Sequence, residues 1–165
     1  MRRISALLSV AAVVLWTVGA YAQAKPDFSG KWVREAPAGG AAAGGGGGGG
    51  GRGGGGGGFG MENTISQNAK TLTVEYTAGQ NPVKLVFNLD GSPSTNKVMG
   101  RGGEAMDQVS KATWDGAKIS ITTAGPNGEI KRVISMEGAN MVIETTAPGR
   151  EGGAPTTNKA VYKKA

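Results

Sequence analysis

The chain has 165 residues, with 18 basic and 12 acidic side chains, a formal net charge of +6, no cysteine and no histidine. The lack of cysteine excludes disulfides, thiolate zinc sites and thiol nucleophiles, and the lack of histidine excludes the Ser-His-Asp triad and the common zinc sites. The basic side chains are spread along the chain in runs of no more than two, so they do not form the clustered basic face of a dedicated nucleic-acid-binding protein.

Residues 1–22 have the three parts of a secretory signal peptide. Arg2 and Arg3 precede an almost wholly apolar run over residues 4–18, and small residues follow at alternating positions up to Ala22 and Ala24. The run is shorter than the roughly 20 residues that a membrane-spanning helix needs, so we expect cleavage rather than a retained anchor. We place the cut after Ala22. The mature protein is therefore predicted to be periplasmic or extracellular, without stable membrane insertion.

A single β domain with a long glycine-rich loop is predicted after the cut. Residues 23–38 carry a first strand within 27–35, residues 39–60 are nearly all glycine and alanine, and residues 61–165 hold the other strands. Glycine loses the most backbone entropy on ordering and has no side chain to bury, so we expect 39–60 to be a flexible coil.

Apolar and polar residues alternate along much of the chain after residue 60, which predicts half-buried strands. These strands are expected over residues 71–77, 82–88, 117–123, 129–136, 141–145 and 158–164. Tight turns between them are marked by Asp90-Gly91, Asp115-Gly116, Asn127-Gly128 and Glu137-Gly138. Consecutive strands should therefore pair as neighbours in an all-β, antiparallel up-and-down meander of about eight strands.

Such a meander can bury its apolar faces by closing into a barrel or by stacking as a β-sandwich, and composition does not decide between them. Trp32 and Trp114 are interpreted as core anchors, with stacking on a ligand as the alternative. Whether the interior is filled or hollow separates a structural role from a binding role. The residues predicted to line that interior are Leu72, Val74, Tyr76, Leu85, Phe87, Trp114, Ile119, Ile121, Met141 and Ile143.

Gly30 and Trp32, in the segment Asp27-Phe28-Ser29-Gly30-Lys31-Trp32, resemble the glycine-x-tryptophan signature that opens the barrels of lipocalins, fatty-acid-binding proteins and avidins. The resemblance implies that Trp32 closes one end of the barrel. It also implies that a basic side chain of the last strand, Lys163 or Lys164, lies over the indole ring, where cation attraction contributes roughly 0.5 to 2 kcal/mol.

The mature chain as a whole resembles secreted bacterial lipocalin-like proteins, of the calycin type, whose function is unassigned. The matching stretches are residues 28–32, 111–116, 118–123 and 161–164. The chain departs from lipocalins in two ways, because lysine stands where they usually place arginine and polyglycine replaces the ordered first loop.

No group of residues in the sequence predicts catalysis, a metal site or a cofactor. Glu75, Glu129, Glu137 and Glu144 fall on predicted solvent faces or turns, where a glycosidase-like carboxylate pair is not expected. The glycine stretch around Arg101 lacks the strand-to-helix context of a phosphate-binding loop, and Arg52 alone is not an array of RNA-binding RGG repeats. We therefore expect a non-enzyme that binds no nucleic acid.

Two functions remain after these exclusions. The first is an exported lipocalin-like barrel that holds a small apolar ligand. The second is a non-catalytic structural or interaction module of the cell envelope, with a filled barrel and the glycine-rich segment as a spacer. A monomer is favoured for either function, although the sequence does not determine the oligomeric state.

Overall fold

The computed structural model describes residues 25–36, 58–100, 103–125, 127–149 and 153–165. The predicted signal peptide and residues 39–57 of the predicted glycine-rich loop lie outside these ranges. In the described part the chain is all β. Its strands are β1 (Gly30–Arg34), β2 (Glu62–Gln67), β3 (Thr71–Ala78), β4 (Asn81–Asn88), β5 (Asp90–Met99), β6 (Ala105–Asp115), β7 (Lys118–Gly125), β8 (Gly128–Glu137), β9 (Asn140–Ala147) and β10 (Thr156–Lys164). A search of the described residues finds no helix with the length and apolar character to cross a membrane.

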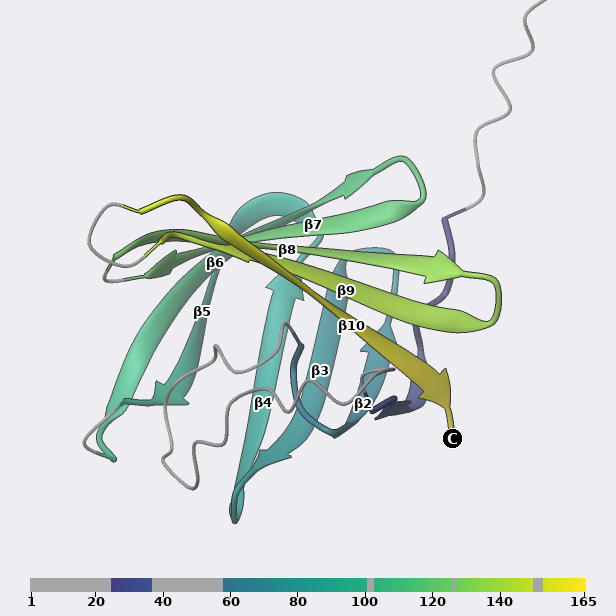
Figure 1. Ribbon diagram of the computed structural model, residues 1–165, viewed down its shortest axis with the longest axis horizontal. Helices are drawn as coiled ribbons and strands as arrows, with labels where there is room; N and C mark the ends of the chain where they lie inside the picture. Colours follow the sequence, from purple (N-terminus) through teal and green to yellow (C-terminus); the bar gives the residue numbers. More distant parts are fainter. Residues whose placement is uncertain (1–24, 37–57, 101–102, 126, 150–152) are drawn as a thin grey trace, which may run out of the picture.

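The strands form one antiparallel 10-stranded sheet in the order β4-β3-β2-β1-β10-β9-β8-β7-β6-β5. The first strand pairs with the last, with Trp32 opposite Lys164, and β1 also pairs with β2. The two strands at the ends of this order, β4 and β5, lie in contact without a backbone ladder. The sheet therefore curls into a nearly closed, lipocalin-like up-and-down barrel, in which β2–β4 cross β7–β10 (Figure 1). The sandwich alternative is excluded.

The sequence predicted about eight strands from apolar alternation, and the structure has 10. Strands β2, β5 and β6 carry no clear alternation of apolar residues, because several of their inward positions are polar or small. On β5 these positions are Ser94 and Asn96, and on β6 they are Ser110 and Ala112. The first strand, Gly30–Arg34, lies within the predicted segment, and it is preceded by a turn in which the Ser29 amide donates to the Asp27 carboxylate at 2.9 Å.

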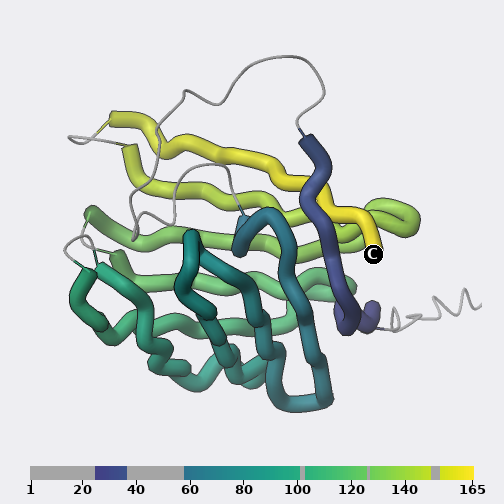
Figure 2. The backbone as a smooth tube through the Cα atoms, turned by 90° about the horizontal axis from the view of Figure 1, so that it is seen from below, coloured from purple at the N-terminus to yellow at the C-terminus, as the bar shows by residue number. Residues whose placement is uncertain are grey.

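The antiparallel order gathers the connections of the barrel at two ends. The short turns β2–β3, β4–β5, β6–β7 and β8–β9 lie at one end, which we call the lower end, together with the C-terminus. Gly116 and Gly138 turn the chain there with φ of +60 and +63, a conformation that residues with a Cβ rarely adopt. The longer connections β1–β2, β5–β6 and β9–β10 lie at the opposite, upper end. Figure 2 shows the C-terminus beside the β8–β9 turn at the lower end.

Candidate functional site

The structure brings the predicted lining residues together inside the barrel. Eight of them are buried in one apolar cluster, and Tyr76 and Trp114 are partly buried and packed against it. The eight buried residues are Leu72, Val74, Leu85, Phe87, Ile119, Ile121, Met141 and Ile143. Because these residues come from β3, β4, β7 and β9, the interior is shared by both halves of the sheet.

Trp32 lies at the lower end of this interior with 1% of its surface exposed. Its indole Nε1 donates a hydrogen bond to the Phe28 carbonyl at 2.8 Å. The Lys164 Nζ lies 5.7 Å from the centroid of the Trp32 ring, whereas Lys163 pairs with Glu35. Gly30 has a φ of +136, and a Cβ there would lie 2.8 Å from the Lys164 side chain. Gly30, Trp32 and Lys164 thus contact one another and cover the lower end of the barrel.

Trp114 lies at the same end and is covered by residues that precede β1. Its ring stacks on Phe28 with centroids 6.2 Å apart, and the Lys25 Nζ lies 5.1 Å from its centroid. The ring is therefore occupied by contacts within the chain, and with Trp32 it makes the lower end of the barrel an apolar floor.

A second group of buried residues in the interior is polar. They face inward because they alternate with outward-facing residues along their strands. The register places Ser94 opposite Ser110 and Ser110 opposite Thr123, and the last two hydroxyls bond each other at 2.9 Å. We call this group the polar belt; its members are Asn63, Ser94, Asn96, Ser110, Thr123, Arg132 and Thr145.

Several atoms of the polar belt have no hydrogen-bond partner. These are Arg132 Nε, Thr145 Oγ1, and both the amide nitrogen and the amide oxygen of Asn63. Arg132 on β8 and Thr145 on β9 lie directly opposite each other, so their unpaired atoms belong to one region of the wall. A buried polar atom without a partner costs about 1–3 kcal/mol. Native proteins leave few such atoms, and those that remain commonly mark a place that water or a ligand fills.

Arg132 is the only buried charged residue in the described part of the chain, with 9% of its surface exposed. Burial lowers the pKa of Arg132, and the neighbouring Tyr76 and Tyr162 act in the opposite direction. No carboxylate of the described residues forms an ion pair with it. Its guanidinium instead lies 5.7 Å from the centroid of the Phe59 ring. A buried cation without an anionic partner is costly, because desolvation is not offset by an opposite charge.

Phe59 reaches this interior from the end of the β1–β2 connection. Its ring centroid lies 6.1 Å from that of Phe87 and 6.5 Å from that of Tyr76. The Tyr162 hydroxyl donates to the Gly60 carbonyl at 2.9 Å and holds the backbone beside Phe59. The segment therefore lies across the interior next to Arg132, in a part of the barrel that the sequence assigned to a flexible loop.

The polar belt was not predicted from the sequence, although alternation offered a signal for part of it. Ile130 and Ile134 were predicted to share one face of their strand, and Arg132 lies between them on that same face. Likewise, Thr145 continues the inward series of Met141 and Ile143. Asn63, Ser94 and Asn96 gave no such signal, because their strands carry too few apolar residues to define a face.

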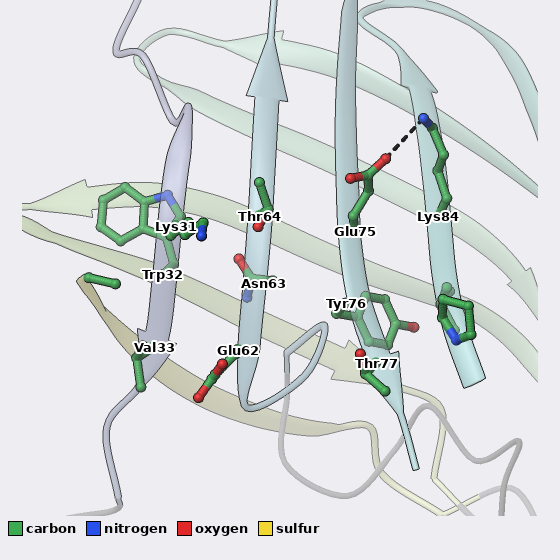
Figure 3. Close-up of a pocket in the computed structure, with 13 residues that line it drawn as sticks. Lys31, Trp32, Val33, Glu62, Asn63, Thr64, Glu75, Tyr76, Thr77 and Lys84 are labelled. Atoms are coloured by element: carbon green, nitrogen blue, oxygen red, sulfur yellow. Dashed lines mark ion pairs between the residues drawn. The ribbon is translucent and has the colours of Figure 1, made fainter. Parts of the chain in front are cut away.

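A shallow depression of about 680 Å³ crosses β1–β4 (Figure 3). Its walls include exposed charged side chains such as Lys31 and Glu62, and an exposed ion pair joins Lys84 to Glu75 at 2.9 Å. Ligand sites are usually concave, mostly apolar and enclosed. This depression is open and also has charged walls, whereas the barrel interior is lined mainly by buried apolar side chains.

The interior offers hydrogen-bond donors and one positive charge. Among the described residues no group of three or more His, Cys, Asp or Glu side chains could hold a metal ion. The carboxylates of Glu75, Glu129, Glu137 and Glu144 all lie on exposed positions. The buried polar groups of the interior are therefore the hydroxyls, amides and guanidinium of the polar belt, without a carboxylate among them.

Comparisons with known proteins find similar folds among solved structures. No protein-family model matches the chain, and no curated protein matches its sequence. Among solved structures, the fold is similar to zebrafish ileal bile acid-binding protein in complex with cholic acid. The two share 21% sequence identity with a TM-score of 0.46, over 63% of this chain and 72% of that chain. The barrel itself is defined by the strand order given above.

Proposed function

We propose that this chain is an exported, non-catalytic barrel that binds a small, largely apolar molecule with an acidic group at one end. The observation that carries the proposal is the buried, unpaired Nε of Arg132 beside the unpaired hydroxyl of Thr145, in an interior that is otherwise mostly apolar. The apolar floor suits a hydrocarbon body, and the polar belt suits the acidic group.

An acidic group is favoured over a neutral one by charge. Hydrogen bonds between a guanidinium and a carboxylate are shorter and stronger than neutral ones. Such a group would also supply the opposite charge that no described carboxylate gives Arg132. A neutral hydroxyl could fill a hydrogen bond but would leave the buried cation uncompensated.

The test compares dodecanoic acid with dodecanol by isothermal titration calorimetry on the mature protein. We expect the acid to bind at least tenfold more tightly, which corresponds to about 1.4 kcal/mol. Arg132→Met keeps an apolar side chain of similar length and should remove this preference while leaving dodecanol binding unchanged. Lys131→Met is the matched control, because Lys131 is the exposed neighbour on the same strand and should change neither ligand.

The same variant separates binding from stability. Replacing a buried charge by an apolar side chain is often neutral or stabilising, so Arg132→Met should unfold at the same or a higher urea concentration than the parent. A variant that loses dodecanoic acid binding because it unfolds would contradict this assignment. Equal affinity of the parent for the acid and the alcohol would overturn the acidic-group proposal.

Export is proposed from the sequence of residues 1–22. Mass spectrometry of the protein recovered from its own cell envelope should find a mature N-terminus at Gln23. Native mass spectrometry of the same sample should find an additional small mass bound to the chain. Recovery of ligand-free protein alone, together with unchanged tryptophan fluorescence across a panel of lipids and fatty acids, would argue against ligand binding.

The second candidate function is a structural module with a filled barrel. It is favoured by the burial of Phe59, which lies at 5% exposure among the core side chains and occupies space next to Arg132. In this case residues 40–58 act as a spacer, and their deletion should abolish retention of partners from envelope extracts. Unchanged retention would remove the spacer role.

A further inference from the structure

The wall of the barrel has one seam, between β4 and β5. These strands follow each other in the chain and lie in contact, yet they stand at opposite ends of the hydrogen-bonded order. The register of β5 with β6 shifts between Asp90 and Pro93, and Pro93 has no amide hydrogen to donate. The start of β5 is therefore irregular, and Pro93 can donate no backbone hydrogen bond to β4.

Side chains of the polar belt bridge the seam in place of a backbone ladder. The Asn96 Oδ1 accepts from the Val86 amide at 2.7 Å, and the Asn96 Nδ2 donates to the Val86 carbonyl at 3.0 Å. The Ser94 hydroxyl accepts from the Asn88 amide at 2.8 Å. Each bond joins the backbone of β4 to a side chain of β5. The Asn88 Nδ2 also donates to the Pro93 carbonyl at 3.2 Å, so three side chains perform the closure that a continuous ladder provides elsewhere.

The other routes into the interior are covered by buried aromatic residues. Trp32 closes the lower end under Lys164, and Phe59 lies over Arg132 near the connection of β1 to β2. Opening either route requires a buried ring to leave the core. Opening the seam requires that the side chains of Asn96, Ser94 and Asn88 give up their hydrogen bonds across it, and no buried aromatic ring takes part in these bonds.

We propose that the β4–β5 seam is the place where the barrel wall opens in the native state, and that ligand passes through it. The second part rests on the proposed binding function; the first part does not. Ser94 lies opposite Ser110, which bonds Thr123, so the seam leads directly into the polar belt. The residues that close the wall would then also be the first polar contacts an entering ligand meets.

Opening is tested by amide hydrogen exchange, followed by NMR on the full mature chain without ligand. The amides of Val86 and Asn88 point toward β5, and those of Leu85 and Phe87 on the same strand point toward the β3 ladder. We expect Val86 and Asn88 to exchange faster than Leu85 and Phe87. The comparison is internal to one strand, so it does not depend on the overall stability of the barrel.

Variants make the exchange test specific. Asn96→Ala should speed exchange at Val86 at least fivefold, the change expected when one ordinary hydrogen bond is lost. Ser94→Ala should do so at Asn88 alone. Thr95→Ala is the matched control, because Thr95 is the exposed residue between them and should change neither amide. Asn96→Asp, which can accept but not donate, keeps one of the two bonds and should fall between the parent and Asn96→Ala.

Passage is tested by stopped-flow binding of 1-anilinonaphthalene-8-sulfonate, an apolar fluorescent anion. Asn96→Ala should raise both its association rate and its dissociation rate, while Thr95→Ala should match the parent in both. If the four amides were equally protected from hydrogen exchange, and Asn96→Ala did not change this, the proposal that the seam opens would be wrong. Faster amide exchange in Asn96→Ala without faster association of the probe would overturn the proposal that ligand passes through the seam. Failure of the parent to bind any acidic probe would instead count against the proposed function.

Discussion

At the scale of single residues, the lower end of the barrel depends on Trp32. The indole is buried, donates to the Phe28 carbonyl, and lies beneath Lys164. Trp32→Ala should cost about 3–5 kcal/mol, as for other large aromatic core residues. Lys164→Ala should cost about 0.5–1 kcal/mol through loss of the cation–π contact. Urea unfolding of the mature protein measures both.

Lys163→Ala is the control for that pair. Lys163 is the next residue along the strand and forms an exposed ion pair with Glu35, and such pairs contribute little. If Lys163→Ala and Lys164→Ala lowered the free energy of unfolding equally, the contact with Trp32 would not be the stabilising one.

The buried Tyr162 and the partly buried Tyr76 predict how stability depends on alkaline pH. Burial raises the pKa of Tyr162 and of Tyr76 above the ordinary value of 10.0. The folded protein therefore holds protons that the unfolded chain releases near pH 10, so the free energy of unfolding should fall as pH rises from there through the folded-state pKa values. Absorbance at 295 nm should show these tyrosines ionising above pH 10.

Tyr162→Phe provides the comparison for the alkaline prediction. It removes one ionisable group and also the hydrogen bond to the Gly60 carbonyl, so it should lower stability at pH 7 by about 1 kcal/mol. Its free energy of unfolding should then decline less steeply above pH 10. A parent protein with constant stability from pH 9 to 11 would contradict the shifted pKa values.

At the scale of elements, hairpin turns could be predicted from residue pairs that contain glycine. One of these turns tests whether glycine is needed there because of its backbone conformation. Gly138 has a φ of +63, and a Cβ added there would meet nothing within 4 Å. Gly138→Ala should therefore destabilise by about 1–2 kcal/mol through backbone strain alone. Gly138→Asn should cost less, because asparagine tolerates this conformation better. Thermal unfolding measures both, and equal costs would show that crowding rather than strain decides.

The strands differed in how well they could be predicted. Strands β3, β4, β7, β8 and β9 alternate apolar and polar residues, so the pattern predicted both the strand and its inward face. Strand β5 carries Ser94 and Asn96 inward because they bridge the seam to β4. A strand that side-chain hydrogen bonds join to its neighbour carries polar residues at inward positions, where the alternating pattern predicts apolar ones.

At the scale of the whole molecule, closure joins the two ends of the described chain. Strand β1 pairs with β10 on one side and with β2 on the other, although residues 35–61 separate it from β2. The entropic cost of closing that connection grows slowly with its length. The barrel therefore tolerates a long connection at this position.

Removing residues 40–52 roughly halves the β1–β2 connection and should stabilise the protein by about 0.6 kcal/mol. Replacing the same residues by an equal number of alternating glycine and serine residues should leave stability unchanged. Denaturant unfolding measures both variants. A loss of more than about 1 kcal/mol on deletion would instead indicate native contacts made by these residues, since such contacts contribute on that order.

The sequence by itself determined the class of the fold, the turns, and the apolar lining, because alternation and glycine geometry are local properties of the chain. Only the tertiary structure decided between barrel and sandwich, since that choice depends on whether β1 meets β10. It also decided which polar residues face inward. Arg132, Asn63 and Thr145 are of residue types that usually lie on the surface, and they are buried here because ten strands close around them.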